Sequence, residues 1–266
     1  MGYDYARRVI RKLVRVAAPN QLGTITHVLT QEPLAALTFD DGPHPINTPR
    51  LLDILERHQA RATFFMLGEA AQRHPEIVRR VAESGHAIGN HSWDHPSFPS
   101  ISRRERIEQI RACAKAISPY NTARLFRPPY GTQNLASRMD AFWLGHQPVT
   151  WNVTTDDWRG GDSILIATQV KQQIQPGSII VLHDRLFDVL DEAYFQRESL
   201  LEAVDIFLHY LGGRFRFVTV PELLRHGRPQ KQFWYKASDI ELLNKLRRQD
   251  GPARRYATHS KKALPR

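Results

Sequence analysis

The sequence predicts a single α/β domain in which seven parallel strands alternate with helices and curl into a barrel. Between residues 35 and 220, short apolar runs alternate with longer segments whose apolar residues recur at helical spacing. That alternation is typical of parallel βα units. No internal repeat or low-complexity linker interrupts it, and 266 residues is an ordinary length for one α/β barrel.

Each predicted strand is a short apolar run that stops at a polar or turn-forming residue. The strands are expected at residues 35–39, 62–67, 86–90, 125–127, 148–153, 178–182 and 215–220. Each predicted helix carries apolar residues three and four positions apart. The helices are expected at residues 5–18, 48–59, 69–84, 102–117, 134–144, 163–174 and 199–211, with a short helix opening at Pro221. Ser102 and Glu105 carry the signature of a capping box.

The net charge of +10 is concentrated at the two ends of the chain. Residues 1–31 carry +4 and residues 231–266 carry +7, whereas residues 32–230 carry −1. We therefore expect a basic N-terminal helix and linker at 1–31, the barrel at 32–230 and a basic C-terminal extension at 231–266. Because the barrel itself is nearly neutral, the charge does not indicate a face that binds nucleic acid.

The sequence predicts a cytoplasmic protein. Cys113 is the only cysteine, so no disulfide can form within the chain, and no apolar run reaches the length of a membrane span. The N-terminus is basic but lacks the apolar core of a cleavable signal peptide. The helix at 5–18 has an apolar stripe and a basic face, which suit peripheral contact with the anionic inner membrane surface. The alternative is an ordinary amphipathic helix docked on the outside of the barrel.

Two adjacent carboxylates, Asp40 and Asp41, stand where the first barrel strand runs into Gly42-Pro43. Neighbouring side chains on a strand point to opposite faces, but at a strand end both can reach one cavity. Placing two acids together is unfavourable unless a metal or another cation stabilises them. The alternative is a solvated turn without a chemical function.

His91 and His95 follow the third predicted strand and lie four residues apart. On one helical turn their imidazoles would share a face and bind one cation. Two histidines and a carboxylate suit a first-row divalent metal, with zinc favoured, and leave positions open for water and substrate. The alternative is two loop histidines that only pack or cap. In α/β barrels the chemistry lies at the carboxyl ends of the strands, where these residues fall.

Five ordered motifs between residues 35 and 225 resemble those of the polysaccharide deacetylase (NodB-homology) family, carbohydrate esterase family 4. They are Thr38-Phe39-Asp40-Asp41-Gly42-Pro43, His91-Ser92-Trp93-Asp94-His95, Arg127-Pro128-Pro129-Tyr130-Gly131, Asp157-Trp158 and Leu182-His183. The resemblance implies a distorted seven-stranded (β/α) TIM-like barrel. It also implies an enzyme that uses a metal to remove acetyl groups from sugars.

Carried over motif by motif, the resemblance implies that Asp41, His91 and His95 hold the metal and that Asp40 is the general base. This agrees with the chemistry of amide hydrolysis, which needs an activated water at neutral pH. One carboxylate serves poorly as both ligand and base, which accounts for two of them.

The same resemblance implies roles for the remaining motif residues. His183 would be the general acid that protonates the departing amine, and Arg127 would orient the base and keep it ionised. Tyr130 would contribute its backbone N–H to stabilise the oxyanion. Trp158 and Leu182 would line the pocket for the acetyl methyl, although core packing explains them nearly as well.

The sequence departs from the family pattern around the fourth motif. Thr154 stands where many relatives carry another acid, and Asp156 is an additional neighbour of Asp157. We expect Asp157 beside His183, but the sequence leaves open which of the two carboxylates tunes the acidity of this histidine. Residues 184–198 form a long acidic and aromatic loop that we expect to narrow the mouth of the site.

The leading hypothesis is therefore a metal-dependent hydrolase that removes N-linked acetyl groups from an N-acetylated amino sugar, with an acetylated glycan as its partner. A second hypothesis is an O-acetyl esterase of acetylated polysaccharide, since the same chemistry serves both. A third is an inactive carbohydrate-binding barrel, which the presence of ligands, base and acid argues against.

Overall fold

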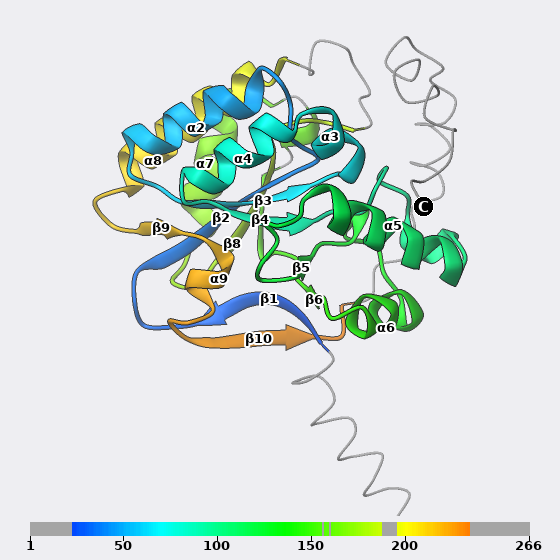
Figure 1. Ribbon diagram of the computed structural model, residues 1–266. Helices are drawn as coiled ribbons and strands as arrows, with labels where there is room; N and C mark the ends of the chain where they lie inside the picture. The colour runs from blue at the N-terminus through cyan, green and yellow to red at the C-terminus, as the bar shows by residue number, and fades with distance from the viewer. Residues whose placement is uncertain (1–22, 156, 160, 188–195, 235–266) are drawn as a thin grey trace, which may run out of the picture.

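The computed structural model describes residues 23–155, 157–159, 161–187 and 196–234 (Figure 1). The helix predicted at 5–18, most of the C-terminal extension and Asp156 lie outside these residues. None of the described helices combines the length and the hydropathy that crossing a bilayer requires.

A curled parallel sheet forms the centre of the molecule, as predicted. Its strands run in the order β6-β5-β4-β3-β2-β8-β7, and β9 pairs with the start of β2 beside this path. Every ladder in this sheet is parallel. The strands are β2 (Leu34–Asp40), β3 (Ala62–Met66), β4 (Ala87–Asn90), β5 (Leu125–Phe126), β6 (Gln147–Pro148), β7 (Val153–Thr154), β8 (Ile179–His183) and β9 (Arg216–Val218).

The prediction of one continuous strand at 148–153 is wrong, because the chain forms two short strands there, β6 and β7. β6 and β7 occupy opposite ends of the sheet order, so the intervening residues 149–152 cross the opening between them. Their backbone bonds reach three different segments: Val149 N–H donates to Phe126, Thr150 N–H to Ile25 and Asn152 N–H to Ile179. The sheet is therefore a distorted barrel that one extended segment closes without a continuous ladder.

Two strands that we did not predict form an antiparallel ribbon below the sheet (Figure 1). β1 (Thr24–Leu29) pairs with β10 (Arg228–Gln232), about 200 residues later in the chain. β1 lies within the region assigned to the N-terminal helix and linker, and β10 crosses the expected end of the barrel at residue 230. A bridge from Ile25 to Val149 joins this ribbon to the closing segment.

The helices match the periodicity of the sequence, with one break. The helix predicted at 69–84 is interrupted at Pro75, which opens a second helix because it has no N–H to donate within the first. The capping box is confirmed: Glu105 N–H donates to Ser102 Oγ, and Ser102 N–H donates to Glu105 Oε2. The helices are α2 (Asn47–Arg57), α3 (Gly68–Arg73), α4 (Pro75–Glu83), α5 (Arg103–Ala116), α6 (Leu135–Trp143), α7 (Ser163–Gln173), α8 (Glu198–Leu211) and α9 (Val220–Leu223).

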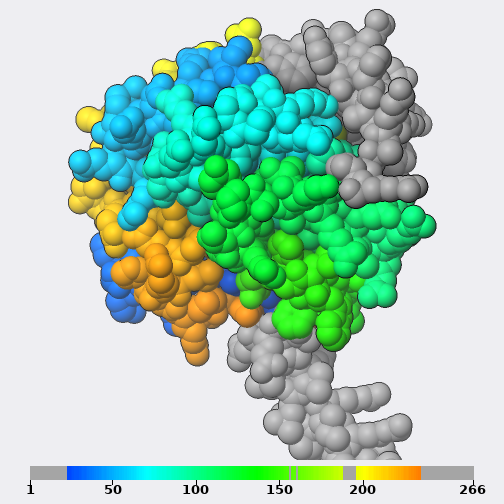
Figure 2. Space-filling view, viewed as in Figure 1, coloured from blue at the N-terminus to red at the C-terminus, as the bar shows by residue number. Residues whose placement is uncertain are grey.

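The main core lies between the sheet and the helices on its outer side. Leu37 and Phe39 of β2, Phe64 of β3 and Phe207 of α8 are fully buried in it. The parts of the chain that include α4, α5 and α6, coloured cyan to green, form much of the face visible in Figure 2. This packing makes the strands rigid, so the residues at their carboxyl ends are held by a fixed scaffold.

Candidate metal centre and active site

Asp40 and Asp41 reach the same site because the backbone turns between them. Asp40 is the last residue of β2, and Asp41 follows with a φ of 73°, in the left-handed region. This turn replaces the strand alternation that would send the two carboxylates to opposite faces. Both side chains are buried. The two acids meet at the strand end, as expected, because Asp41 adopts this left-handed backbone conformation.

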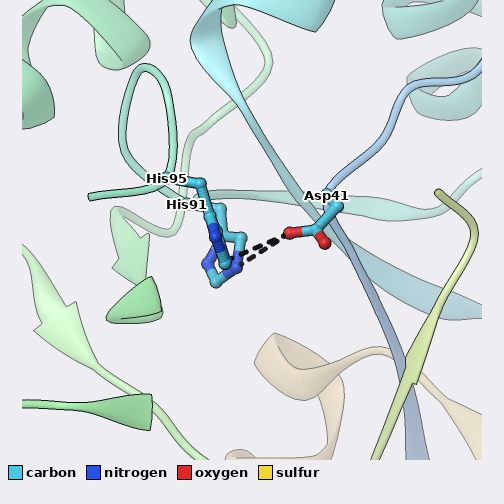
Figure 3. A group of neighbouring side chains, drawn as sticks. All are labelled: Asp41, His91 and His95. Carbon is cyan, nitrogen blue, oxygen red and sulfur yellow. Dashed lines mark ion pairs between the residues drawn. The ribbon is translucent and has the colours of Figure 1, made fainter. Parts of the chain in front are cut away.

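His91 and His95 lie close together, but not on the helical turn that their spacing suggested. Residues 91–97 are irregular, and Ser92 and His95 have φ angles of 74° and 61°. Folded in this way, the loop places the two imidazole centroids 5.0 Å apart. Figure 3 shows both rings directed at the Asp41 carboxylate.

Asp41, His91 and His95 have the donor set of a metal centre. The Nε2 atoms of His91 and His95 each lie 3.3 Å from Asp41 Oδ1 (Figure 3). The His91 Nδ1–H donates to the Arg127 carbonyl at 2.8 Å, which leaves Nε2 as the ring nitrogen that can offer a lone pair to a metal. Asp41 Oδ1 is buried without a hydrogen bond among the described residues. Three lone-pair-bearing atoms within 4.8 Å of one another fit a bound divalent cation.

The protonation of these groups suits metal binding. Burial lowers the pKa of His95 to about 3, so its imidazole is neutral at physiological pH. Burial raises the pKa of Asp41, but the neighbouring imidazoles outweigh it and hold that pKa below its ordinary value. The backbone N–H of Phe187 also donates to Asp41 Oδ2 at 3.1 Å. An ionised Asp41 and a neutral His95 are the forms of these two groups that can bind a metal.

Asp40 is held separately from this triad by Arg127. The Arg127 side chain is fully buried; its Nη1 donates to Asp40 Oδ1 at 2.7 Å and to Thr38 Oγ1 at 2.6 Å. Its Nη2 donates to the Thr150 carbonyl, and its guanidinium stacks 4.1 Å above the Phe65 ring. The guanidinium thus gives Asp40 a charge-assisted partner of its own, apart from the two histidines that face Asp41.

His183 lies on the strand next to Asp40, since Asp40 and His183 are register partners in the β2–β8 ladder. Its Nδ1–H points at Asp157, with Oδ1 at 3.1 Å. Burial lowers the pKa of His183, but the Asp157 carboxylate more than offsets this and raises it to about 9. Of the two carboxylates left open by the sequence, Asp157 contacts the histidine, and Asp156 lies outside the described residues.

Tyr130 lies beside the triad in a strained turn. Its φ is 56°, and its ring centroid is 4.3 Å from that of His95. Gly131 follows with a φ of 61°, and a Cβ there would lie 2.7 Å from the Trp151 ring. Glycine is therefore required for Trp151 to pack behind this turn.

Trp158 and Leu182 are placed differently from each other. Trp158 is half-buried beside Asp157, with the Arg159 guanidinium 4.5 Å from its ring. Leu182 is fully buried in the main core with Phe39, on the side of the sheet that faces the helices. Alternation along β8 puts Val181, not Leu182, on the same face as His183.

Sequence reasoning missed three contributors to this site. Phe187 supports Asp41 through its backbone and lies with its ring 5.3 Å from that of His95. Trp234, just after β10, donates from its indole N–H to the Gly131 carbonyl at 2.9 Å. Arg197 contacts both Asp157 and His183. Phe187 and Arg197 lie in the 184–198 loop that was expected at the mouth. The contacts with Asp41, Asp157 and Gly131 join positions 40 to 146 apart in the chain, so no local pattern marked these contacts.

Comparison with known proteins identifies relatives of this chain. Residues 27–149 match the polysaccharide deacetylase family. The chain is 36% identical over 166 residues to the chitooligosaccharide deacetylase of Azorhizobium caulinodans, covering 61% of this chain and 79% of that protein. The chain belongs to the polysaccharide deacetylase family. It is therefore a hydrolase of the N-deacetylase class, which acts on carbon–nitrogen bonds.

Further relatives are similar in sequence or in fold. The chain is 37% identical over 204 residues to a peptidoglycan-N-acetylglucosamine deacetylase of Bacillus cereus, covering 75% of this chain and 92% of that protein. A solved peptidoglycan N-acetylglucosamine deacetylase superposes with a TM-score of 0.69 at 31% identity, covering 77% of this chain and 94% of that one. A pseudoenzyme of the family from Bacillus anthracis superposes with a TM-score of 0.68 at 24% identity and shows the fold alone.

Proposed function

We propose that this deacetylase is zinc-dependent and removes N-linked acetyl groups from N-acetylglucosamine units of a glycan chain. The observation that carries the proposal is the convergence of Asp41 Oδ1 with the Nε2 atoms of His91 and His95, beside a carboxylate that Arg127 holds apart. Zinc favours two histidines and one carboxylate with an open position. When bound, the cation would polarise the acetyl carbonyl and acidify water.

Asp40 is the residue that we assign to proton removal. Its Oδ1 accepts from Arg127, so Oδ2 is the atom with remaining capacity to accept a proton from attacking water. His91 Nε2 lies 3.8 Å from Asp40 Oδ2 and 3.3 Å from Asp41 Oδ1, which supports a division between base and ligand. The proton taken by Asp40 comes from the water whose oxygen bonds to the acetyl carbon.

His183 is the residue that we assign to proton donation. Its Nδ1–H is committed to Asp157, so Nε2 is the atom available to the departing sugar nitrogen. The pKa of about 9 keeps the imidazole protonated at neutral pH. When the carbon–nitrogen bond breaks, the nitrogen keeps the bonding pair and takes this proton, which leaves a free amine and acetate. We assign oxyanion stabilisation to the backbone N–H of Tyr130, a residue whose ring lies 4.3 Å from that of His95.

The names of the relatives support the glycan class. They describe deacetylases of chitooligosaccharides and of peptidoglycan N-acetylglucosamine, and both kinds of substrate contain an N-acetylated amino sugar. An acetylated glycan of this kind is therefore the partner that we propose for the site.

The test uses the purified full chain with three substrates: chitooligosaccharides of increasing length, peptidoglycan fragments and acetylxylan. Mass spectrometry should show acetyl loss from the first two, with little from the acetylxylan ester. Chelation should abolish this loss and added zinc should restore it. Acetate release from acetylxylan alone would contradict the proposal and favour an O-acetyl esterase. Activity that resists exhaustive chelation would contradict the metal dependence.

A further inference from the structure

Arg197 joins the two residues assigned to proton donation, although it belongs to neither of their strands. It precedes α8 and is only 5% exposed. Its Nε donates to the His183 carbonyl and its Nη1 to the Asp157 carbonyl, both at 2.9 Å. Its Nη2 donates to Asp157 Oδ2. One guanidinium thus contacts the end of β8 and the 3₁₀ turn at Asp157–Arg159 together.

The donors around Asp157 decide which oxygen the imidazole uses. Oδ2 accepts from Arg197 and also from the His183 backbone N–H at 3.0 Å. Oδ1 is the nearer oxygen to His183 Nδ1, at 3.1 Å against 3.3 Å for Oδ2. With Oδ2 occupied by two donors, Oδ1 is left as the acceptor for the Nδ1–H. This arrangement fixes the orientation of the ring, with Nδ1–H toward Asp157 and Nε2 on the opposite side.

The backbone at Arg197 is also unusual. Its φ of 52° lies in the left-handed region, which is unfavourable for a residue with a Cβ. It occupies the N-cap position of α8, yet its side chain makes no capping hydrogen bond there. The side chain instead points inward to Asp157. A residue held in such a conformation persists where its surroundings require it.

We infer that Arg197 is a positioning residue for the general acid: it holds the Asp157 carboxylate so that His183 presents Nε2 to the leaving nitrogen. The inference rests on the proposed function of His183. It differs from a purely structural role of the ion pair, which would support the fold without affecting proton donation selectively.

A comparison of an amide substrate with an aryl ester distinguishes a positioning role of Arg197 from a purely structural one. An acetyl amide needs a proton on its nitrogen as the bond breaks, whereas 4-nitrophenyl acetate expels a stable phenolate without one. Arg197→Gly is the main variant, because glycine accepts the left-handed backbone and leaves space for free guanidinium. Arg50→Ala is the matched control, since Arg50 pairs with Glu198, the neighbour of Arg197, and does not contact Asp157.

We expect Arg197→Gly to lower kcat on chitooligosaccharides about 10- to 100-fold, within the range of general-acid effects. KM should change less than about twofold, because the contact matters in the transition state. Turnover of 4-nitrophenyl acetate and bound metal should be nearly unchanged. In a His183→Ala background the same substitution should have no further effect, and added guanidinium should restore part of the activity of the single variant.

Equal losses on amide and aryl ester, or an additional loss in the His183→Ala background, would overturn the inference and leave Arg197 a structural residue. An equal loss of amide turnover in Arg50→Ala would also overturn the inference, since it would show that the loss comes from a disturbed start of α8. NMR of the His183 Nδ1–H signal tests positioning without turnover: the signal should shift or vanish in Arg197→Gly, and an unchanged signal would overturn the inference. A wild-type chain inactive on every amide would instead contradict the proposed function alone.

Discussion

Arg127 and Asp40 form a fully buried pair, with Nη1 2.7 Å from Oδ1, at the centre of the sheet's carboxyl edge. The pair separates Asp40 from the adjacent Asp41, whose carboxylate faces two histidines instead. One strand end therefore supplies two carboxylates in two electrostatic environments. Differences of this kind allow neighbouring acids to take different chemical roles.

The first prediction distinguishes these roles. Asp40→Asn should reduce kcat about 10²- to 10⁴-fold while the protein retains its metal, because the amide cannot accept the proton. Asp41→Asn should lose metal, because a neutral amide is a weak ligand for zinc. Activity measured beside metal analysis checks both. Loss of metal to the same extent in both variants would contradict the division.

The second prediction concerns the two histidines. His91→Ala and His95→Ala should each weaken metal binding strongly and abolish turnover, while circular dichroism shows a folded protein. His209→Ala is the control, because His209 is exposed on α8 and far along the chain from the triad. Stoichiometric metal in a His91→Ala, His95→Ala double variant would rule out this ligand set.

The third prediction tests the contact between the β1–β10 ribbon and the site. Trp234 Nε1 donates to the Gly131 carbonyl, and its ring lies 5.8 Å from that of Trp151. Trp234→Phe keeps an aromatic ring, although a smaller one, but loses the indole N–H, so the free energy of unfolding should fall by at least about 1 kcal/mol. Trp234→Ala should lower the free energy of unfolding further and should also lower kcat, because the turn at Tyr130 loses its support. Denaturant titration and turnover check this. Full activity in Trp234→Ala would show that the turn holds without the ribbon.

The fourth prediction is a dependence of stability on pH through His86. Its Nδ1 accepts from the Ala62 N–H at 3.1 Å, and burial, with a smaller effect of Arg61, lowers its pKa from 6.5 to about 4. Between these two pH values the unfolded chain binds a proton that the folded chain excludes, so stability is lost as pH falls through that range. The loss is at most about 3.5 kcal/mol, since each pKa unit corresponds to about 1.4 kcal/mol.

His86→Gln removes this titrating group, so its free energy of unfolding should vary less than that of the wild type between pH 6.5 and 4. The pKa of His44 is also lowered to about 4, so the wild type and the variant should keep a common residual slope. Identical pH profiles for the two proteins would show that His86 is not protected from protonation in the folded state.

The fifth prediction concerns the basic N-terminus, which lies outside the described residues. The amphipathic pattern at 5–18 predicts sedimentation of the full chain with anionic liposomes at low salt, and release at high salt as the charges are screened. A chain that starts near Gln21 keeps β1 and should bind much less. Equal binding by both chains, or by neither, would favour a helix without a membrane role.

Sequence alone was sufficient for the features that depend on local chemistry. The apolar runs predicted the central strands, and the capping box and Pro221 located helix starts, because such signals act within a few residues. Asp40, Asp41, His91, His95 and His183 were identified in the same way, since each stands where a strand ends. The family resemblance then added roles that geometry alone does not assign.

Tertiary structure decided what depends on residues far apart in the chain. The ribbon of β1 and β10 and the split of residues 148–153 into β6 and β7 follow from pairing partners that no local pattern reveals. Left-handed backbone at Asp41 and His95 decided that their side chains meet, against the usual alternation and helical spacing. The pairing of Arg197 with Asp157, 40 positions apart in the chain, is seen only in the tertiary structure, because the partner of a buried charge depends on proximity in space.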